Sequence, residues 1–209
     1  MAQNPPMTTA ILSAAYFGPV QWYQKLNRYD RCLIECHDHY IKQTYRNRCT
    51  IATTQGMQTL SVPIERYDGL KCAMRDIRVS DHGNWRHLHW NALMSAYGES
   101  PFFEYYADDI RPFFEKRWEF LFDFNMEITF KMCELIDIRP TISTTDAYVA
   151  DTAGMHDLRD TIRPKHPLLD EQFVPTPYYQ VYRQKHGFLP NLSVLDLLFN
   201  EGNEAVFYL

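Results

Sequence analysis

The sequence lacks several patterns that would place it in a functional class at once. It has no long run of basic residues, and its 209 residues carry a formal net charge of −5. Duplex nucleic acid is therefore not an expected partner, because binding its phosphates requires concentrated positive charge. Internal repeats and low-complexity segments are also absent. The length and composition predict one domain, residues 1–209, with enough apolar side chains for a sizeable core.

The sequence also lacks a stretch that is long and apolar enough to cross a membrane. Its first residues have neither the positive segment nor the long apolar run of a secretory signal. The cysteines are odd in number and lack the spacing of a disulfide framework, which is typical of reduced thiols in the cytosol. These features predict a soluble, cytoplasmic protein. The cysteines are Cys32, Cys36, Cys49, Cys72 and Cys133.

Motifs for several common chemistries are missing. There is no P-loop, G-x-G-x-x-G, G-x-S-x-G or H-E-x-x-H motif, so ordinary NTPase and hydride-transfer chemistry have no support. Cysteine and histidine do cluster in residues 32–39, but their spacing matches no common zinc site. A strand there would also send Cys36 and His37 to opposite faces. We therefore expect no metal site, and the sequence indicates no particular cofactor.

The clearest pattern that is present is a β-α-β unit in residues 8–37. Residues 8–14 form a short apolar run, Pro19 stands at a typical helix start, and residues 31–37 read as a second strand. Such a unit normally has parallel strands and a right-handed crossover. The loop at residues 16–19 would then lie at the carboxyl end of the first strand, where ligands bind in open α/β sheets.

Strand patterns are concentrated early and helical patterns late. Residues 40–53 and 58–65 read as a hairpin around a glycine-containing turn, and residues 74–80 as a further strand. Helices are expected to begin near Asn84, Pro101 and Pro112. We therefore expect an α/β or α+β fold in a single domain, with an N-terminal β-α-β unit and a mixed sheet followed by a helical block. The expected parts are a strand-rich part (1–82), a helical block (83–140), a loop-rich segment (141–190) and a C-terminal helix (191–209).

The stretch from Tyr40 to Ile51 carries three cations. If it is extended, Lys42, Arg46 and Arg48 lie on one side of the strand, opposite a more apolar set. Neighbouring like charges repel, so an anion between them would stabilise the arrangement. The alternative is a solvated edge strand whose charge prevents pairing with other strands. The pattern predicts either an anion site or such an edge.

Two residues on predicted helices are further candidates. His89 lies on the same helical face as Trp85, where its neighbours predict burial. A buried imidazole needs partners for its ring nitrogens, either a core tyrosine or a ligand. Asp196 stands among leucines in the last helix and is expected to be paired or to lie on a polar face, with Ser193 or Asn191 as the helix cap.

Several stretches together resemble the WbqC-like protein family. They occur in the family's order over nearly the whole sequence: AYFGPVQWYQKL, KQTYRNRCTI, LSVPIE, NWRHLHWNALMSAY, SPFFEYY, DFN and GFLPNLSVLDLLFNEG. The resemblance favours arginines at a pocket, since a guanidinium can bind phosphate or carboxylate through two hydrogen bonds. The resulting predictions are His89 as the catalytic residue and Lys42, Arg46, Arg48, Tyr16 and Tyr97 as ligand-binding residues.

Members of this family are often encoded with bacterial O-antigen and nucleotide-sugar genes. The resemblance therefore implies a role in surface-polysaccharide biosynthesis, as a transferase acting on a nucleotide-linked sugar or its carrier. One alternative is a non-catalytic protein that binds a nucleotide or glycan intermediate; another is an interaction module whose aromatic helices form a homo-oligomer. The expected ligand is small and carries a phosphate or carboxylate. An enzyme would have His89 within reach of the cationic pocket, whereas a scaffold would not need this.

Overall fold

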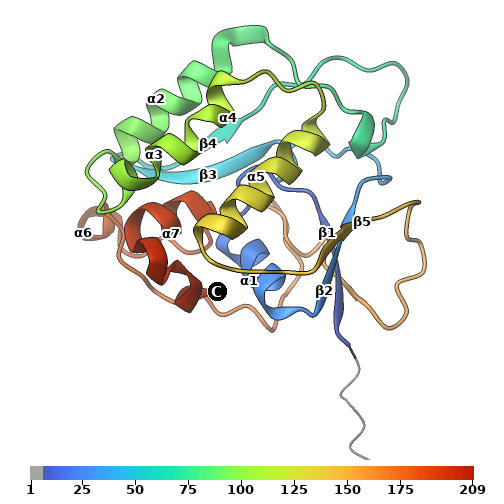
Figure 1. Ribbon diagram of the computed structural model, residues 1–209. Coiled ribbons are helices and arrows are strands. Elements are labelled where there is room, and N and C mark those ends of the chain that lie inside the picture. The colour runs from blue at the N-terminus through green and yellow to red at the C-terminus, as the bar shows by residue number, and fades with distance from the viewer. Residues whose placement is uncertain (1–6) are drawn as a thin grey trace, which may run out of the picture.

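The computed structural model describes residues 7–209 and has a mixed α/β fold (Figure 1). A parallel sheet has the strand order β5-β2-β1-β6, and a separate antiparallel pair is formed by β3 and β4. The predicted fold class is confirmed, although parallel and antiparallel strands lie in two sheets rather than in one mixed sheet. The strands are β1 (Thr9–Ser13), β2 (Arg31–Glu35), β3 (Arg48–Thr53), β4 (Gly56–Ser61), β5 (Ile142–Thr144) and β6 (His156–Asp157).

The predicted β-α-β unit is confirmed at the N-terminal end. β1 pairs in parallel with β2, and the helix α1 (Val20–Arg28) connects them. Pro19 immediately precedes this helix, where the missing amide hydrogen of proline costs no intrahelical hydrogen bond. The central residues of β1 are all buried, which is the near-continuous apolar pattern of a strand inside a parallel sheet.

Most of the helical structure lies between β2 and β5. In Figure 1, α1 and α5 lie on the same side of the parallel sheet, and α2 lies beside the hairpin. No helix within residues 7–209 is both long and apolar enough to span a bilayer. The remaining helices are α2 (Trp85–Tyr97), α3 (Phe103–Ile110), α4 (Pro112–Glu115), α5 (Leu121–Leu135), α6 (Arg183–His186) and α7 (Val194–Glu201), which is followed by a 3-10 helix over Gly202–Tyr208.

Two helical predictions need correction in their extent. The helix expected from Pro112 ends at Glu115, because the backbone at residues 119 and 120 is bridged to residues 78 and 79 instead. The C-terminal helix expected over residues 191–209 is shorter, since Ser193 caps α7 by accepting a hydrogen bond from the amide of Leu195.

The strand predicted for residues 74–80 is wrong. A 3-10 turn, Met74–Asp76, occupies its first half, and only isolated bridges follow. The loop-rich segment predicted for residues 141–190 also contains two strands that the sequence pattern did not reveal. Both β5 and β6 are very short, and they form the outer edges of the parallel sheet.

The extended conformation predicted from residue 40 is wrong for its first half. Residues 42–47 form turns and bends, and β3 begins only at Arg48. Gln43 has a φ of 63°, in the left-handed region, so the chain reverses direction there. Lys42 and Arg46 consequently do not share a strand face with Arg48, and the period-two argument does not apply to them.

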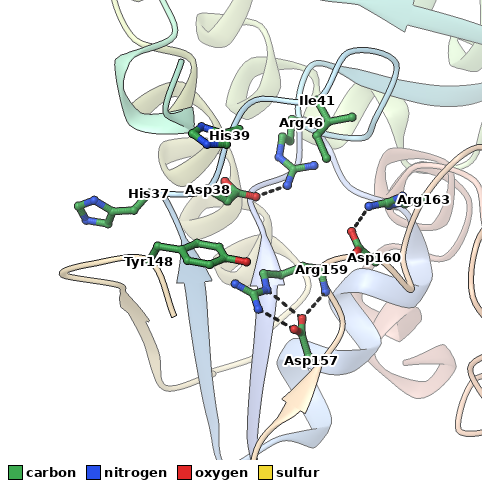
Figure 2. A pocket seen from close by; sticks show the side chains of 10 residues that line it. All are labelled: His37, Asp38, His39, Ile41, Arg46, Tyr148, Asp157, Arg159, Asp160 and Arg163. Atoms are coloured by element: carbon green, nitrogen blue, oxygen red, sulfur yellow. Dashed lines mark hydrogen bonds and ion pairs between the residues drawn. The ribbon is translucent and has the colours of Figure 1, made fainter. Parts of the chain in front are cut away.

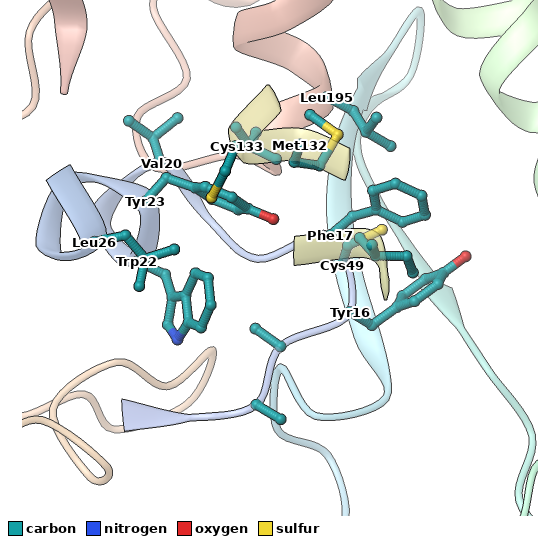
Figure 3. Close-up of a cluster of buried hydrophobic side chains, with 14 of the residues drawn as sticks. Tyr16, Phe17, Val20, Trp22, Tyr23, Leu26, Cys49, Met132, Cys133 and Leu195 are labelled. Carbon is teal, nitrogen blue, oxygen red and sulfur yellow. The ribbon is translucent and has the colours of Figure 1, made fainter. Parts of the chain in front are cut away.

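The core gathers side chains from distant parts of the sequence around the loop that follows β1 (Figure 3). Tyr16 and Phe17 in this loop are fully buried, and they pack with residues such as Cys49 of β3, Met132 of α5 and Leu195 of α7. Tightly packed aromatic rings leave little freedom to the backbone that carries them. The core therefore fixes the carboxyl end of β1, where the sheet can bind a ligand.

Candidate functional site

A pocket of about 570 Å³ lies at the carboxyl ends of the parallel strands (Figure 2). The chain adds β2 and β5 on one side of β1 and then returns to place β6 on the other side. In open α/β sheets, ligands bind where the strand order reverses in this way. We call this the switch-point pocket; it is lined by His37, Asp38, His39, Ile41, Arg46, Tyr148, Asp157, Arg159, Asp160 and Arg163.

Arg159 is held by partners within the protein. Its Nε and Nη2 donate to the carboxylate of Asp157 at 2.9 and 2.6 Å, and its Nη1 donates to Glu35 at 3.2 Å. Nη1 also donates to the carbonyl of Val149 at 3.0 Å, and the guanidinium lies 5.1 Å from the ring centroid of Tyr148. With these donors in use, Arg159 mainly ties the strands together at the pocket.

Glu35, the last residue of β2, connects the segments that surround the pocket. Burial acts to raise its pKa, but hydrogen bonds from the amides of Val149 and His37, the hydroxyl of Thr145 and the charge of Arg159 together lower the pKa below its ordinary value. Both carboxylate oxygens accept hydrogen bonds. Glu35 is thus a satisfied structural carboxylate that joins β2 to the segments after β5 and β6.

Arg46 and Asp38 form a second, buried ion pair. Arg46 is 2% exposed; its Nη2 donates to Asp38 Oδ2 and, at 2.8 Å, to Ser13 Oγ, while its Nη1 donates to Thr44. Its backbone carbonyl accepts from Asn125 Nδ2 at 2.8 Å. Among the described residues, Asp38 Oδ1 and Arg46 Nε are buried atoms that have no hydrogen-bond partner. Burial raises the pKa of Asp38, an effect that Arg46 opposes only in part.

Arg163 forms the most exposed ion pair of the pocket. It donates to Asp160, whose side chain is 63% exposed. Ion pairs of this kind contribute about 0 to 1 kcal/mol, because water and salt screen them. An anionic ligand can therefore replace Asp160 at small cost, whereas Arg159 is also paired with the fully buried Glu35, and Arg46 with Asp38, whose side chain is 11% exposed. Arg163 is the arginine of this pocket that is best placed to bind an anion.

The model of the WbqC-like protein family matches residues 14–163 of this sequence. The chain belongs to the WbqC-like protein family. The matched region contains Asp38, Arg46 and Arg159 and ends at Arg163, so it includes the arginines of the switch-point pocket. A Mycobacterium tuberculosis (strain ATCC 25618 / H37Rv) relative, "Uncharacterized protein Rv1507c", is 27% identical over 225 residues, covering 96% of each chain. No solved structure matches this WbqC-like chain.

The predicted catalytic residue of this WbqC-like protein, His89, lies in the aromatic core. Its Nδ1 is 2.9 Å from the hydroxyl of Tyr16, and its ring contacts that of Trp85 with centroids 5.2 Å apart. Burial lowers the pKa of His89 to about 4, and the backbone of Ser61 opposes this shift. The imidazole is therefore neutral near pH 7, bonded to a core tyrosine, and is not among the residues that line the switch-point pocket.

The predicted ligand-binding residues are spread over several places. Arg46 lies in the switch-point pocket, whereas the exposed Lys42 lines a different hollow of about 450 Å³ beside Tyr67. Arg48, at the start of β3, is half-buried. The hydroxyl of Tyr97 donates to Asp196 at 2.9 Å. The structure therefore brings only Arg46 of this set into the switch-point pocket; ligand contacts by Lys42, Arg48, Tyr16 and Tyr97, and catalysis by His89, stay predictions.

Sequence reasoning missed Asp38, Arg159 and Arg163. The signal was present in the segment DLRDTIR, residues 157–163, where acids and arginines alternate. This segment lacks apolar periodicity, which is typical of a loop. Asp38 stands among cysteine and histidine residues, whose types indicate zinc binding and not an ion pair. Within residues 7–209 no group of three or more His, Cys, Asp or Glu side chains is arranged to hold a metal ion, and the five cysteines are free.

A second hollow of about 770 Å³ lies between the hairpin and α2. It is larger than the switch-point pocket, but its lining contains no charged side chain and no buried polar atom that lacks a partner. Functional sites tend to carry buried titratable groups with shifted pKa values, and Asp38 in the switch-point pocket is such a group. We therefore take the switch-point pocket as the candidate site of this WbqC-like protein.

Proposed function

We propose that the switch-point pocket binds a nucleotide-linked sugar, or the carrier of such a sugar. In this proposal the protein is a cytoplasmic transferase of bacterial surface-polysaccharide, O-antigen-like, biosynthesis. The observation that carries it is the placement of Arg163, Arg46 and Asp38 in one pocket at the reversal of strand order. Membership of the WbqC-like family supports the assignment to glycan assembly.

The chemistry of the pocket suits such a ligand. Its volume of about 570 Å³ falls within the usual range for small-ligand sites, about 300 to 1,000 Å³. Arg163 can exchange its exposed partner for a phosphate oxygen. Sugar hydroxyls both donate and accept hydrogen bonds, and the pocket offers carboxylates, arginines and the exposed ring of Tyr148 to contact them.

A non-catalytic binding protein for the same ligand is the second candidate. The observation that favours it is the position of His89, which is enclosed by aromatic rings outside the switch-point pocket. Incubating the protein with the ligand that binds best and with candidate acceptors, followed by mass spectrometry, separates the two candidates. A transferase joins the sugar to an acceptor and releases its nucleotide or carrier, whereas a binding protein returns the ligand unchanged.

The binding proposal is tested by thermal unfolding with a panel of ligands. The panel contains UDP-, GDP- and dTDP-linked sugars, the corresponding nucleotides, free sugars and acetyl-CoA. A nucleotide-linked sugar should raise Tm, and Arg163→Ala should weaken its binding about 10-fold or more by removing a charge-assisted hydrogen bond.

The matched control for this experiment is Arg139→Ala. Arg139 is another arginine, 93% exposed in its side chain and absent from the lining of the pocket. Its replacement should leave both Tm and affinity unchanged. If both variants bind the nucleotide-linked sugar equally weakly, the loss of affinity reflects general surface charge and not the pocket. If no nucleotide-linked sugar raises the Tm of the wild type, the binding proposal is wrong.

A further inference from the structure

Asp38 differs from the other carboxylates at the switch-point pocket. Glu35 and Asp157 accept hydrogen bonds at both oxygens, and Asp160 is largely exposed. Asp38 is mostly buried, with a side chain 11% exposed, yet only its Oδ2 is engaged. Its Oδ1 has no partner among the described residues, although buried acceptors are normally satisfied.

Arg46 orients the carboxylate of Asp38. The guanidinium that holds Asp38 Oδ2 is itself bonded to Ser13, at the end of β1, and to Thr44. The backbone of the same arginine is bonded to Asn125 of α5. Because each of these contacts restricts the arginine, the carboxylate of Asp38 has a defined position at the pocket wall, as Figure 2 shows.

We propose that Asp38 is the specificity-determining residue of the switch-point pocket, and that its carboxylate accepts a hydrogen bond from a hydroxyl or ammonium group of the ligand. This inference rests on the proposed function, because it assigns a role within the same pocket. It also narrows the ligand class: the ligand carries a hydrogen-bond donor at its buried end and an anionic group at the end that reaches Arg163. Arg46 is the positioning residue for Asp38.

The charges around Asp38 support a donor rather than an anion at this position. Arg46 and Arg159 face it with positive charge, but Arg46 is paired with Asp38 itself and Arg159 with Glu35 and Asp157. Glu35 adds a further negative charge nearby. An anionic group placed beside the Asp38 carboxylate would meet like charge, whereas a hydroxyl or ammonium group would donate a hydrogen bond to it.

The test compares the wild type with Asp38→Asn, using the nucleotide-linked sugar that binds best and the nucleotide without its sugar. Asp38→Asn should weaken binding of the nucleotide-linked sugar about 10- to 100-fold, as expected for loss of a charge-assisted hydrogen bond, and should change nucleotide binding less than about 3-fold. The matched control is Asp137→Asn, which changes an aspartate whose side chain is 82% exposed and does not line the pocket, and it should not weaken binding of either probe.

A set of analogues locates the donor group. In each analogue one sugar hydroxyl is replaced by fluorine, which cannot donate a hydrogen bond. One analogue should bind the wild type about 10-fold more weakly and bind Asp38→Asn no worse than the parent sugar does, because the shared contact is already lost. Asp38→Glu, which keeps the charge but moves the oxygens, provides a second variant if Asp38→Asn does not fold.

The outcomes separate the two proposals. If the wild type binds no nucleotide-linked sugar, the proposed function fails. If the wild type binds one and a folded Asp38 variant binds it equally well, only the inference about Asp38 is overturned. The inference would also be overturned if the Asp38 variants lost affinity equally for the nucleotide and for the nucleotide-linked sugar. Asp38 would then support the structure of the whole pocket and would not select the sugar.

Discussion

Replacing Asp196 with asparagine should remove a pH dependence from the stability of this protein. Asp196 is 1% exposed and accepts hydrogen bonds from Tyr97 Oη at 2.9 Å, Tyr178 Oη at 2.7 Å and Gln180 Nε2 at 2.9 Å. Burial raises its pKa from 3.8 to about 6, and the three hydrogen bonds limit that rise. No cation forms an ion pair with it among the described residues.

The magnitude follows from the difference between the folded and unfolded pKa. In the unfolded chain Asp196 loses its proton near its ordinary pKa, whereas in the folded protein it keeps the proton until about pH 6. Between these values the folded state binds more protons, so the free energy of unfolding falls as pH rises. At about 1.4 kcal/mol per pH unit, the loss is about 3 kcal/mol and is complete above about pH 7.

The assay is urea unfolding of the wild type and Asp196→Asn at a series of pH values from about 4 to 8. Asparagine has nearly the same shape, and the tyrosine hydroxyls can accept from its amide, so the variant should fold. Relative to the wild type, the variant should gain about 2.5 kcal/mol as pH rises across the series, because part of the unfolded-state titration lies below pH 4. The contribution of other titrating groups cancels in this difference.

An exposed aspartate provides the control for this experiment. Asp123→Asn, in the first turn of α5, should follow the wild type across the series. A constant difference in stability between Asp196→Asn and the wild type would refute the reasoning. It would mean that three hydrogen bonds outweigh burial and keep Asp196 ionised throughout.

Two further predictions concern other buried polar groups. Lys25→Met should lower the free energy of unfolding by about 3 to 5 kcal/mol in urea unfolding at pH 7, because it leaves the buried Asp170, 2.7 Å from Lys25 Nζ in the wild type, without its cation. Adding Asp170→Asn should recover most of this loss. A cost below about 1 kcal/mol for the single variant would contradict the prediction. His89 should titrate by NMR with a midpoint near 4 and show no ring-proton change between about pH 5.5 and 8, whereas a midpoint near 6.5 would mean that the ring reaches solvent.

The parts of the fold that the sequence predicts are those determined by local pattern. The apolar run before Pro19, the helix after it and the parallel second strand need only the periodicity and helix-start chemistry of residues 8–37. The burial of His89 likewise follows from its position on the same helical face as Trp85. In each case neighbours within one or two turns determine the result.

The parts that the sequence does not predict depend on distant partners. β6 is two residues long, His156–Asp157, and it forms only because β1 offers its edge. No periodicity can be read from so short a strand. The turn at Gln43 needs a left-handed backbone at a residue that rarely adopts it, and this turn decides where Arg46 points.

The same dependence on distant partners decides where the cations of residues 40–51 lie. Arg46 lines the switch-point pocket, and ligand binding by Lys42, Arg46 and Arg48 stays a prediction. The charge of Arg46 is balanced by Asp38, however, and its hydrogen bonds join Ser13 of β1 to the turn before β3. An ion pair this deeply buried cannot exchange its acid for a ligand at small cost, so our proposal assigns the anion to Arg163, whose partner Asp160 is 63% exposed. The same proposal makes Arg46 the positioning residue and Asp38 the acceptor, so the ligand it describes supplies a hydrogen-bond donor.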